Sequence, residues 1–148
     1  MPIRPELLPP PVAPERLAEA AALVGEILHD HFAGQDPSAA LAALNRLTGR
    51  GYALQEIVEP CHDGDVAVFA ERALLPDPVR VADVSDEELL EIIALVAGCE
   101  RGEAEIDYWL EFLVRNLPHP AISDLIFWAN LTPAEILAAA KAYQPIRL

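Results

Sequence analysis

The chain has 148 residues, enough for one ordinary domain or two small ones, and 53% of them are apolar, which excludes disorder throughout. No apolar run approaches the roughly 18 residues of a membrane span, and the first residues lack the features of a signal peptide, so we expect a cytoplasmic protein without a membrane partner. The net charge of -14 argues against a nucleic-acid partner, because phosphate contacts need Lys and Arg. It suits a basic protein partner, or it only maintains solubility.

The first segment, residues 1–14, is rich in proline, at positions 2, 5, 9, 10, 11 and 14. Proline fixes φ and has no backbone N–H, so most of the segment cannot form a helix or the interior of a sheet. We interpret it as an extended, disordered arm. A ligand for a proline-reading module is the alternative.

Residues 15–75 are predicted to form a helical N-terminal region. Apolar periodicity, caps and stop signals place helices over 15–33, 36–49, 52–59 and 65–75. Asp36 and Asp65 are the expected caps of the second and fourth helices. Residues 52–59 fit neither a helical nor a strand period cleanly, and we interpret them as a short helix. A linker is expected over 76–84, where prolines interrupt the pattern.

Two clusters in this region contain residue types that bind metals. They consist of His29, Asp30, His31 and Asp36, and of Cys61, His62, Asp63 and Asp65. Neither shows the i, i+4 histidine pair or the paired cysteine spacing of a zinc site. The chain also lacks a glycine-rich phosphate loop and a nucleophile elbow. We therefore expect no enzyme activity, metal or cofactor, and a metal-dependent hydrolase is the least favoured function.

The clearest helix start follows the linker, where Ser85 and Glu88 have the spacing of a capping box. It predicts a helix over 86–97. The next helix is expected over 103–117, where Pro118 stops it. Its predicted core stripe consists of Ile106, Leu110, Leu113 and Leu117.

A row of acidic residues occupies another face of this second helix. Glu103, Asp107 and Glu111 recur at four-residue steps, where like charges repel each other. Such a row does not stabilise the helix. It indicates either a solvated face or a surface that meets a basic partner.

The stretch from His119 to Trp128 reads HPAISDLIFW and predicts a very short helix after a His-Pro break, with Ser123 and Asp124 at its start. Four consecutive large apolar residues follow, and they cannot all face one core if they are helical. The segment is therefore either buried on every side or an exposed aromatic anchor. A last helix begins with a second capping box, formed by Thr132 and Glu135, and extends to about residue 143.

These signals together give residues 85–143 a resemblance to the immunity proteins of nuclease bacteriocins, the E-type colicins and S-type pyocins. In that family a small four-helix protein has a very short third helix, introduced by His-Pro and reading S-D-L-I before two aromatic residues. The chain matches this string from His119 to Ile126, with Phe127 and Trp128 where the family usually has two tyrosines. The resemblance implies an all-α protein whose C-terminal domain, 85–148, follows an additional helical region.

The resemblance also implies a function and a surface. The family binds the basic nuclease domain of its toxin beside the catalytic site and excludes DNA. Carried over by position, the anchor consists of Asp124, Phe127 and Trp128. The face that selects the toxin consists of Ile106, Asp107, Leu110, Glu111 and Val114, and the acidic row adds Glu103. Leu125 and Ile126 are then expected to face the core. A helical scaffold or regulator unrelated to toxins is the alternative.

Overall fold

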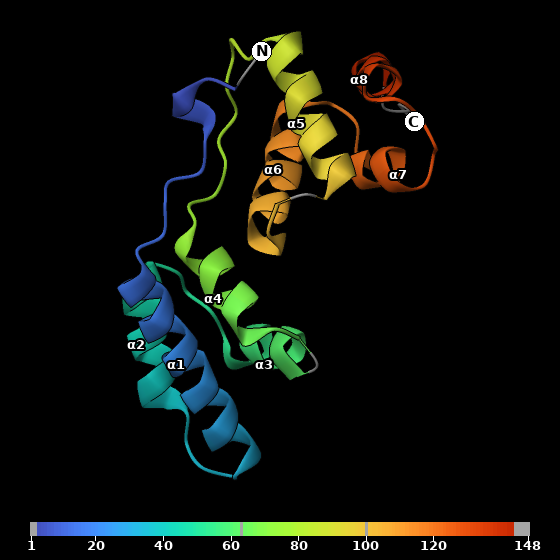
Figure 1. Cartoon of the computed structure of the whole chain (residues 1–148). Helices are drawn as coiled ribbons and strands as arrows, with labels where there is room; N and C mark the ends of the chain where they lie inside the picture. The colour runs from blue at the N-terminus through green and yellow to red at the C-terminus, as the bar shows by residue number, and fades with distance from the viewer. Residues whose placement is uncertain (1–2, 63, 100, 144–148) are drawn as a thin grey trace, which may run out of the picture. The chain divides into compact units, whose positions relative to one another are not determined.

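A computed structural model describes residues 3–62, 64–99 and 101–143 (Figure 1). Within these ranges the chain forms eight α-helices and one short 3-10 helix, and no strand. The prediction of an all-α protein is confirmed. The helices belong to two compact units. One consists of Pro10–Pro76, and the other combines Met1–Pro9 with Asp77–Leu148.

The unit Pro10–Pro76 contains α1 (Pro14–Phe32), α2 (Ser38–Thr48), α3 (Leu54–His62) and α4 (Val66–Leu74). Helix α1 packs against each of the other three. Their buried side chains form a core of their own, which includes Val24, Ile27, Leu44, Ile57 and Phe69. Burial of this apolar surface is the main stabilising contribution to the unit.

The ends of these helices show how the local sequence directs the fold. The Asp65 carboxylate accepts a hydrogen bond from the Ala67 N–H at 2.9 Å, which confirms Asp65 as the cap of α4. Asp36 does not cap α2 in the expected way. Its carboxylate accepts bonds from the backbone and hydroxyl of Ser38, and Pro37 occupies the cap position. Gly49 then ends α2 with a φ of 72°, a left-handed conformation that glycine adopts at little cost.

The second unit contains η1 (Pro5–Leu7), α5 (Asp86–Gly98), α6 (Glu103–Asn116), α7 (Ile122–Phe127) and α8 (Pro133–Ala142). Helix α5 packs against α6, α7 and α8, and α7 also contacts α6 and α8. The core includes Ile92, Ile93, Trp109, Phe112 and Ile136. Helix α7 has only six residues, so tertiary packing rather than intrinsic propensity must stabilise it.

Both predicted capping boxes are present in this unit. The Ser85 hydroxyl accepts from the Glu88 N–H at 3.1 Å, and the Glu88 carboxylate accepts from the Ser85 N–H at 3.0 Å. Thr132 and Glu135 exchange the same two bonds at the start of α8. Each box satisfies two backbone N–H groups that a helix start leaves without an internal partner. The starts of α5 and α8 are therefore set locally.

The structure corrects the expectation of an extended, disordered arm for the part of residues 1–14 that lies in this unit. Ile3 and Leu7 are 9% and 6% exposed and belong to the same core as α5 and α6. Pro5 occupies the first position of η1, where its missing N–H costs nothing. The prolines thus shape a short turn whose apolar residues pack against helices that follow much later in the chain.

Candidate partner-binding surface

The start of α7 is positioned by the His-Pro break rather than by Ser123 or Asp124. The His119 Nδ1 accepts a hydrogen bond from the Ala121 N–H at 2.9 Å, and the His119 ring lies 4.9 Å from that of Tyr143, measured between centroids. Ala121 is the cap residue and makes no side-chain cap bond. Ser123 and Asp124 lie in the first turn of α7, as predicted, but neither caps the helix, and both side chains are exposed.

The run of apolar residues in α7 divides between the core and the solvent. Ile126 is buried and Leu125 is half-buried against the core, whereas Phe127 is 43% exposed and Trp128 is 83% exposed. Successive side chains on a helix point about 100° apart, so one core cannot receive all four. The Trp128 N–H donates to the Asp124 carbonyl at 2.9 Å, which ends the helix and fixes the backbone of the aromatic pair.

Helix α6 buries a different stripe from the one predicted. Trp109, Phe112 and Leu113 are at most 1% exposed, whereas Ile106 and Leu110 are only half-buried at the edge of the core. Trp109 and Phe112 occupy the interior because their large apolar rings remove much apolar area from water there, whereas Tyr108 is only half-buried. The prediction is confirmed for Leu113 and Leu117, and in part for Ile106 and Leu110, which pack against the core without being buried in it.

The resemblance to the immunity proteins implied a set of partner-binding residues in α6. These residues lie at the edge of the core or on the outer face of the helix. The exposed ones are Glu103, Glu111 and Val114, and the half-buried ones are Ile106, Asp107 and Leu110. Helices α6 and α7 contact each other within one unit, so both predicted sets lie on neighbouring helices (Figure 1). We call the exposed and half-buried residues of these two sets the α6–α7 surface.

An ion pair at the end of α6 was not predicted. The Arg115 Nε donates to the Glu111 carboxylate at 3.0 Å, and both side chains are about half exposed. The four-residue spacing, with Glu before Arg, is the favourable order for such a pair. This spacing was visible in the sequence. The last member of the acidic row is therefore paired with a cation.

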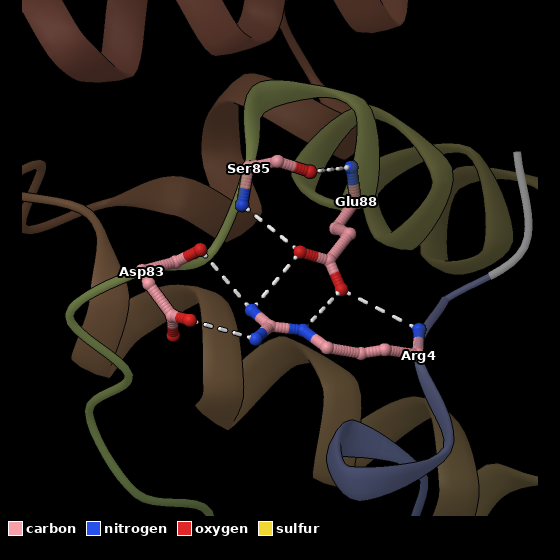
Figure 2. A network of polar contacts seen from close by, with 4 residues as sticks. All are labelled: Arg4, Asp83, Ser85 and Glu88. Carbon is pink, nitrogen blue, oxygen red and sulfur yellow. Dashed lines mark hydrogen bonds and ion pairs between the residues drawn. The ribbon is translucent and has the colours of Figure 1, made fainter.

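A second unpredicted network joins the first residues of the chain to the start of α5 (Figure 2). The Arg4 guanidinium donates to Glu88 through two nitrogens at 2.9 and 3.1 Å, and to the Asp83 carboxylate at 2.9 Å. The bonds from Arg4 to Glu88, with that from the Ser85 N–H, hold the pKa of Glu88 at about 2. The same guanidinium lowers the pKa of Asp83. No sequence signal indicates this network, because 84 positions separate Arg4 from Glu88.

The two potential metal clusters gain no support. Among the residues that the structure describes, no group of three or more His, Cys, Asp or Glu side chains is placed to hold a metal ion. The side chains of His62 and Asp63 lie outside the described part. Cys61 is buried, and its burial raises the pKa of the thiol. Its environment therefore favours the thiol over the metal-binding thiolate.

Comparison with known proteins agrees with the geometry of the C-terminal helices. Residues 81–145 match the family model described as colicin immunity protein / pyocin immunity protein. A curated relative, the uncharacterized protein YezA of Bacillus subtilis (strain 168), is 30% identical over 63 residues, which cover 41% of this chain and 93% of the relative. No solved structure gives a significant match. Through its C-terminal residues the chain belongs to the colicin and pyocin immunity protein family, as the resemblance predicted.

Membership of a family of immunity proteins indicates a role in bacteriocin immunity, and it points to inhibition rather than catalysis. In the described residues, no helix combines the length and the apolar character needed to cross a membrane.

Proposed function

We propose that the chain is an immunity protein that binds a bacteriocin nuclease and blocks it through the α6–α7 surface, next to the toxin's active site. One observation carries the proposal: α7 presents Phe127 and Trp128 to solvent beside an acidic helix, in a domain of the immunity family. Large exposed aromatic side chains are uncommon on a surface that meets only water.

The aromatic pair has the properties of a binding anchor. Each ring offers a large apolar area with only two rotatable side-chain bonds, so little entropy is lost when a partner covers it. Anchors of this kind contribute about 2 kcal/mol or more to binding. Asp124, exposed in the same helix, can accept a hydrogen bond from a Lys or Arg of the toxin.

The charge of the protein suits a nuclease as the partner. Nuclease domains that bind DNA need basic surfaces, and this chain has a net charge of -14. Glu103 and Asp107 place part of that charge on α6. Opposite charges accelerate the encounter of two proteins, and a bound acidic domain repels DNA from the toxin.

The experiment uses the full chain and the nuclease domain of a bacteriocin encoded by the adjacent gene. Co-expression should restore survival, and the purified proteins should form an equimolar complex. Replacing Phe127 and Trp128 with Ala should each weaken binding by roughly 30-fold, which corresponds to about 2 kcal/mol. Phe32→Ala is the matched control, because Phe32 is 58% exposed but lies in the other unit. Failure of the wild-type chain to bind would overturn the proposal. Equal binding by the α7 variants and the control would overturn the anchor.

A further inference from the structure

The start of α5 is an acidic site whose cations come from distant parts of the chain. Asp86, Glu87 and Glu88 lie in the first turn of the helix, and Asp83 precedes it. Lys141 pairs with Asp86. In the described part of the chain, Glu88 is the charged residue that is buried, at 8% exposure. Burial of a carboxylate beside other acids requires a positively charged partner, so the site at Asp83 and Glu88 needs a second cation.

Arg4 supplies this cation, and its guanidinium contacts the site through all three of its nitrogens (Figure 2). Nε and Nη2 donate to the two carboxylate oxygens of Glu88 at 2.9 and 3.1 Å. Nη1 donates to the Asp83 carboxylate at 2.9 Å, and Nη2 also donates to the Asp83 carbonyl at 3.1 Å. The ammonium of a lysine lacks this fork of donors. The site therefore recognises arginine.

Apolar side chains on both sides of the arginine complete the contact. Ile3 and Leu7 are 9% and 6% exposed and belong to the core of α5–α8, whereas Glu6 and Leu8 are exposed. The Leu7 N–H donates to the Arg4 carbonyl at 3.0 Å, which closes the turn of η1 between these residues. Residues 3–9 therefore contact the C-terminal unit as a bound peptide would, through Ile3, Arg4 and Leu7.

This N-terminal segment is far in sequence from the site that it occupies. Arg4 lies 79 positions before Asp83, and the unit Pro10–Pro76, with a core of its own, lies between them. Among the described residues, that core includes none from 3–9. Residues 81–145 match the immunity family, so the segment also lies outside the part of the chain that carries this match. Its detachment would break its own contacts and leave the helices of both cores packed against one another.

We infer that the C-terminal unit carries a binding site for a peptide in which arginine lies between two apolar residues, and that residues 3–9 are its ligand in cis. The segment detaches and docks again while both cores stay folded, because it makes few contacts and the chain keeps it close to the site. A free peptide of the same sequence binds the site when the chain's own segment is weakened. The inference is independent of the proposed function, since it involves no toxin.

Hydrogen exchange of the full, unmodified chain is the first test. The N–H groups of Arg4, Leu7 and Leu8 donate to the site or to carbonyls of the segment. They should share a protection of roughly 100-fold to 1,000-fold, and the amides of Ile92 and Ile93 in α5 should be protected at least about tenfold more. Equal protection of all five amides would mean that the segment leaves only when the core unfolds. Protection of the first three below about tenfold would mean that the segment is not docked, and either result overturns the inference.

The second test supplies the segment in trans. The full chain with Arg4→Ala and Leu7→Ala is titrated with a peptide of residues 1–9, and the NMR signals of residues 85–89 are followed. An effective concentration of about 1 mM in cis and the protection above predict a Kd of roughly 10 µM or tighter. A Glu6→Gln peptide should bind equally, because Glu6 is exposed, whereas an Arg4→Lys peptide should bind at least about fivefold more weakly.

The absence of saturable shifts up to about 1 mM peptide, or equal binding by the Arg4→Lys peptide, would overturn the inference. Hydrogen exchange needs no variant, so it decides the question if the double variant does not fold.

Discussion

The Nε of Arg4 lies 2.9 Å from a carboxylate oxygen of Glu88, and this ion pair attaches the first residues of the chain to the start of α5. Glu88 is only 8% exposed, and its carboxylate also accepts from the Ser85 N–H. One side chain therefore completes a capping box and holds the N-terminal segment (Figure 2). We call residues 3–9 the clasp.

The pKa of Glu88 predicts how the stability of this unit depends on pH. Its value is about 2 in the folded chain, below the ordinary value of 4.5, so the folded state releases the proton more readily than the unfolded state. The stabilisation is present above about pH 4.5 and is lost as the pH falls toward 2. Urea unfolding should show that Glu88→Gln is less stable than the wild type at pH 7, and that the difference shrinks below pH 4. A difference that stays constant down to pH 2 would contradict this assignment.

The clasp should contribute measurably to the core of the C-terminal unit. Leu7 is 6% exposed and Leu8, its neighbour, is 47% exposed. Leu7→Ala should lower the free energy of unfolding by about 2 kcal/mol or more, because it leaves a cavity, whereas Leu8→Ala should cost well under 1 kcal/mol. Chemical denaturation of the two variants makes the comparison within one segment. Equal effects would mean that the clasp does not pack in solution.

The caps can be compared with a residue of similar size that caps nothing. Thr132→Ala should destabilise the C-terminal unit by about 1 kcal/mol, because the Glu135 N–H loses its acceptor. Ser123→Ala should be nearly neutral, since Ser123 is exposed and does not cap α7. Thermal melts of both variants measure this difference in stability. A loss on replacing Ser123 as large as that for Thr132 would mean that the Ser123 hydroxyl caps α7 in solution.

The fluorescence of the two tryptophans can show directly whether the anchor is exposed or covered. Trp109 is fully buried and Trp128 is 83% exposed, so acrylamide should quench only the second in the free protein. Trp128→Phe should remove the quenchable, red-shifted part of the emission. Complex formation with the toxin should protect Trp128 and shift its emission to the blue, while a Trp128 that remains quenchable in the complex would argue against its burial by the partner.

The local parts of this fold were readable from the sequence, and the nonlocal parts were not. The capping boxes depend on residues three positions apart, so Ser85 and Thr132 predicted the starts of α5 and α8 correctly. In α6, apolar residues lie on several sides of the helix, and periodicity could not decide between Ile106 and Trp109 for the core. Packing places the larger, aromatic side chain of Trp109 in the core.

The candidate site follows the same distinction. The short α7 was predicted from the string after His119, but four successive apolar residues left open whether it is buried on every side or exposes its aromatic residues. The resemblance to the immunity proteins implied that Phe127 and Trp128 are exposed, as they are. The ion pair between Glu111 and Arg115 could have been predicted, because these two residues have the same four-residue spacing as the members of the acidic row. Arg4 could not have been found in this way, since its partner lies 84 positions later in the chain.

The clasp also imposes an order on the assembly of the molecule. Residues 3–9 are synthesised before the unit Pro10–Pro76, but the core residues that they join, in α5 and α6, are made only after that whole unit. That unit has its own core and can fold while synthesis continues. Ile3 and Leu7 therefore stay exposed until α5 and α6 have been made, so the core of the C-terminal unit is completed by a segment that was synthesised well before the rest of it.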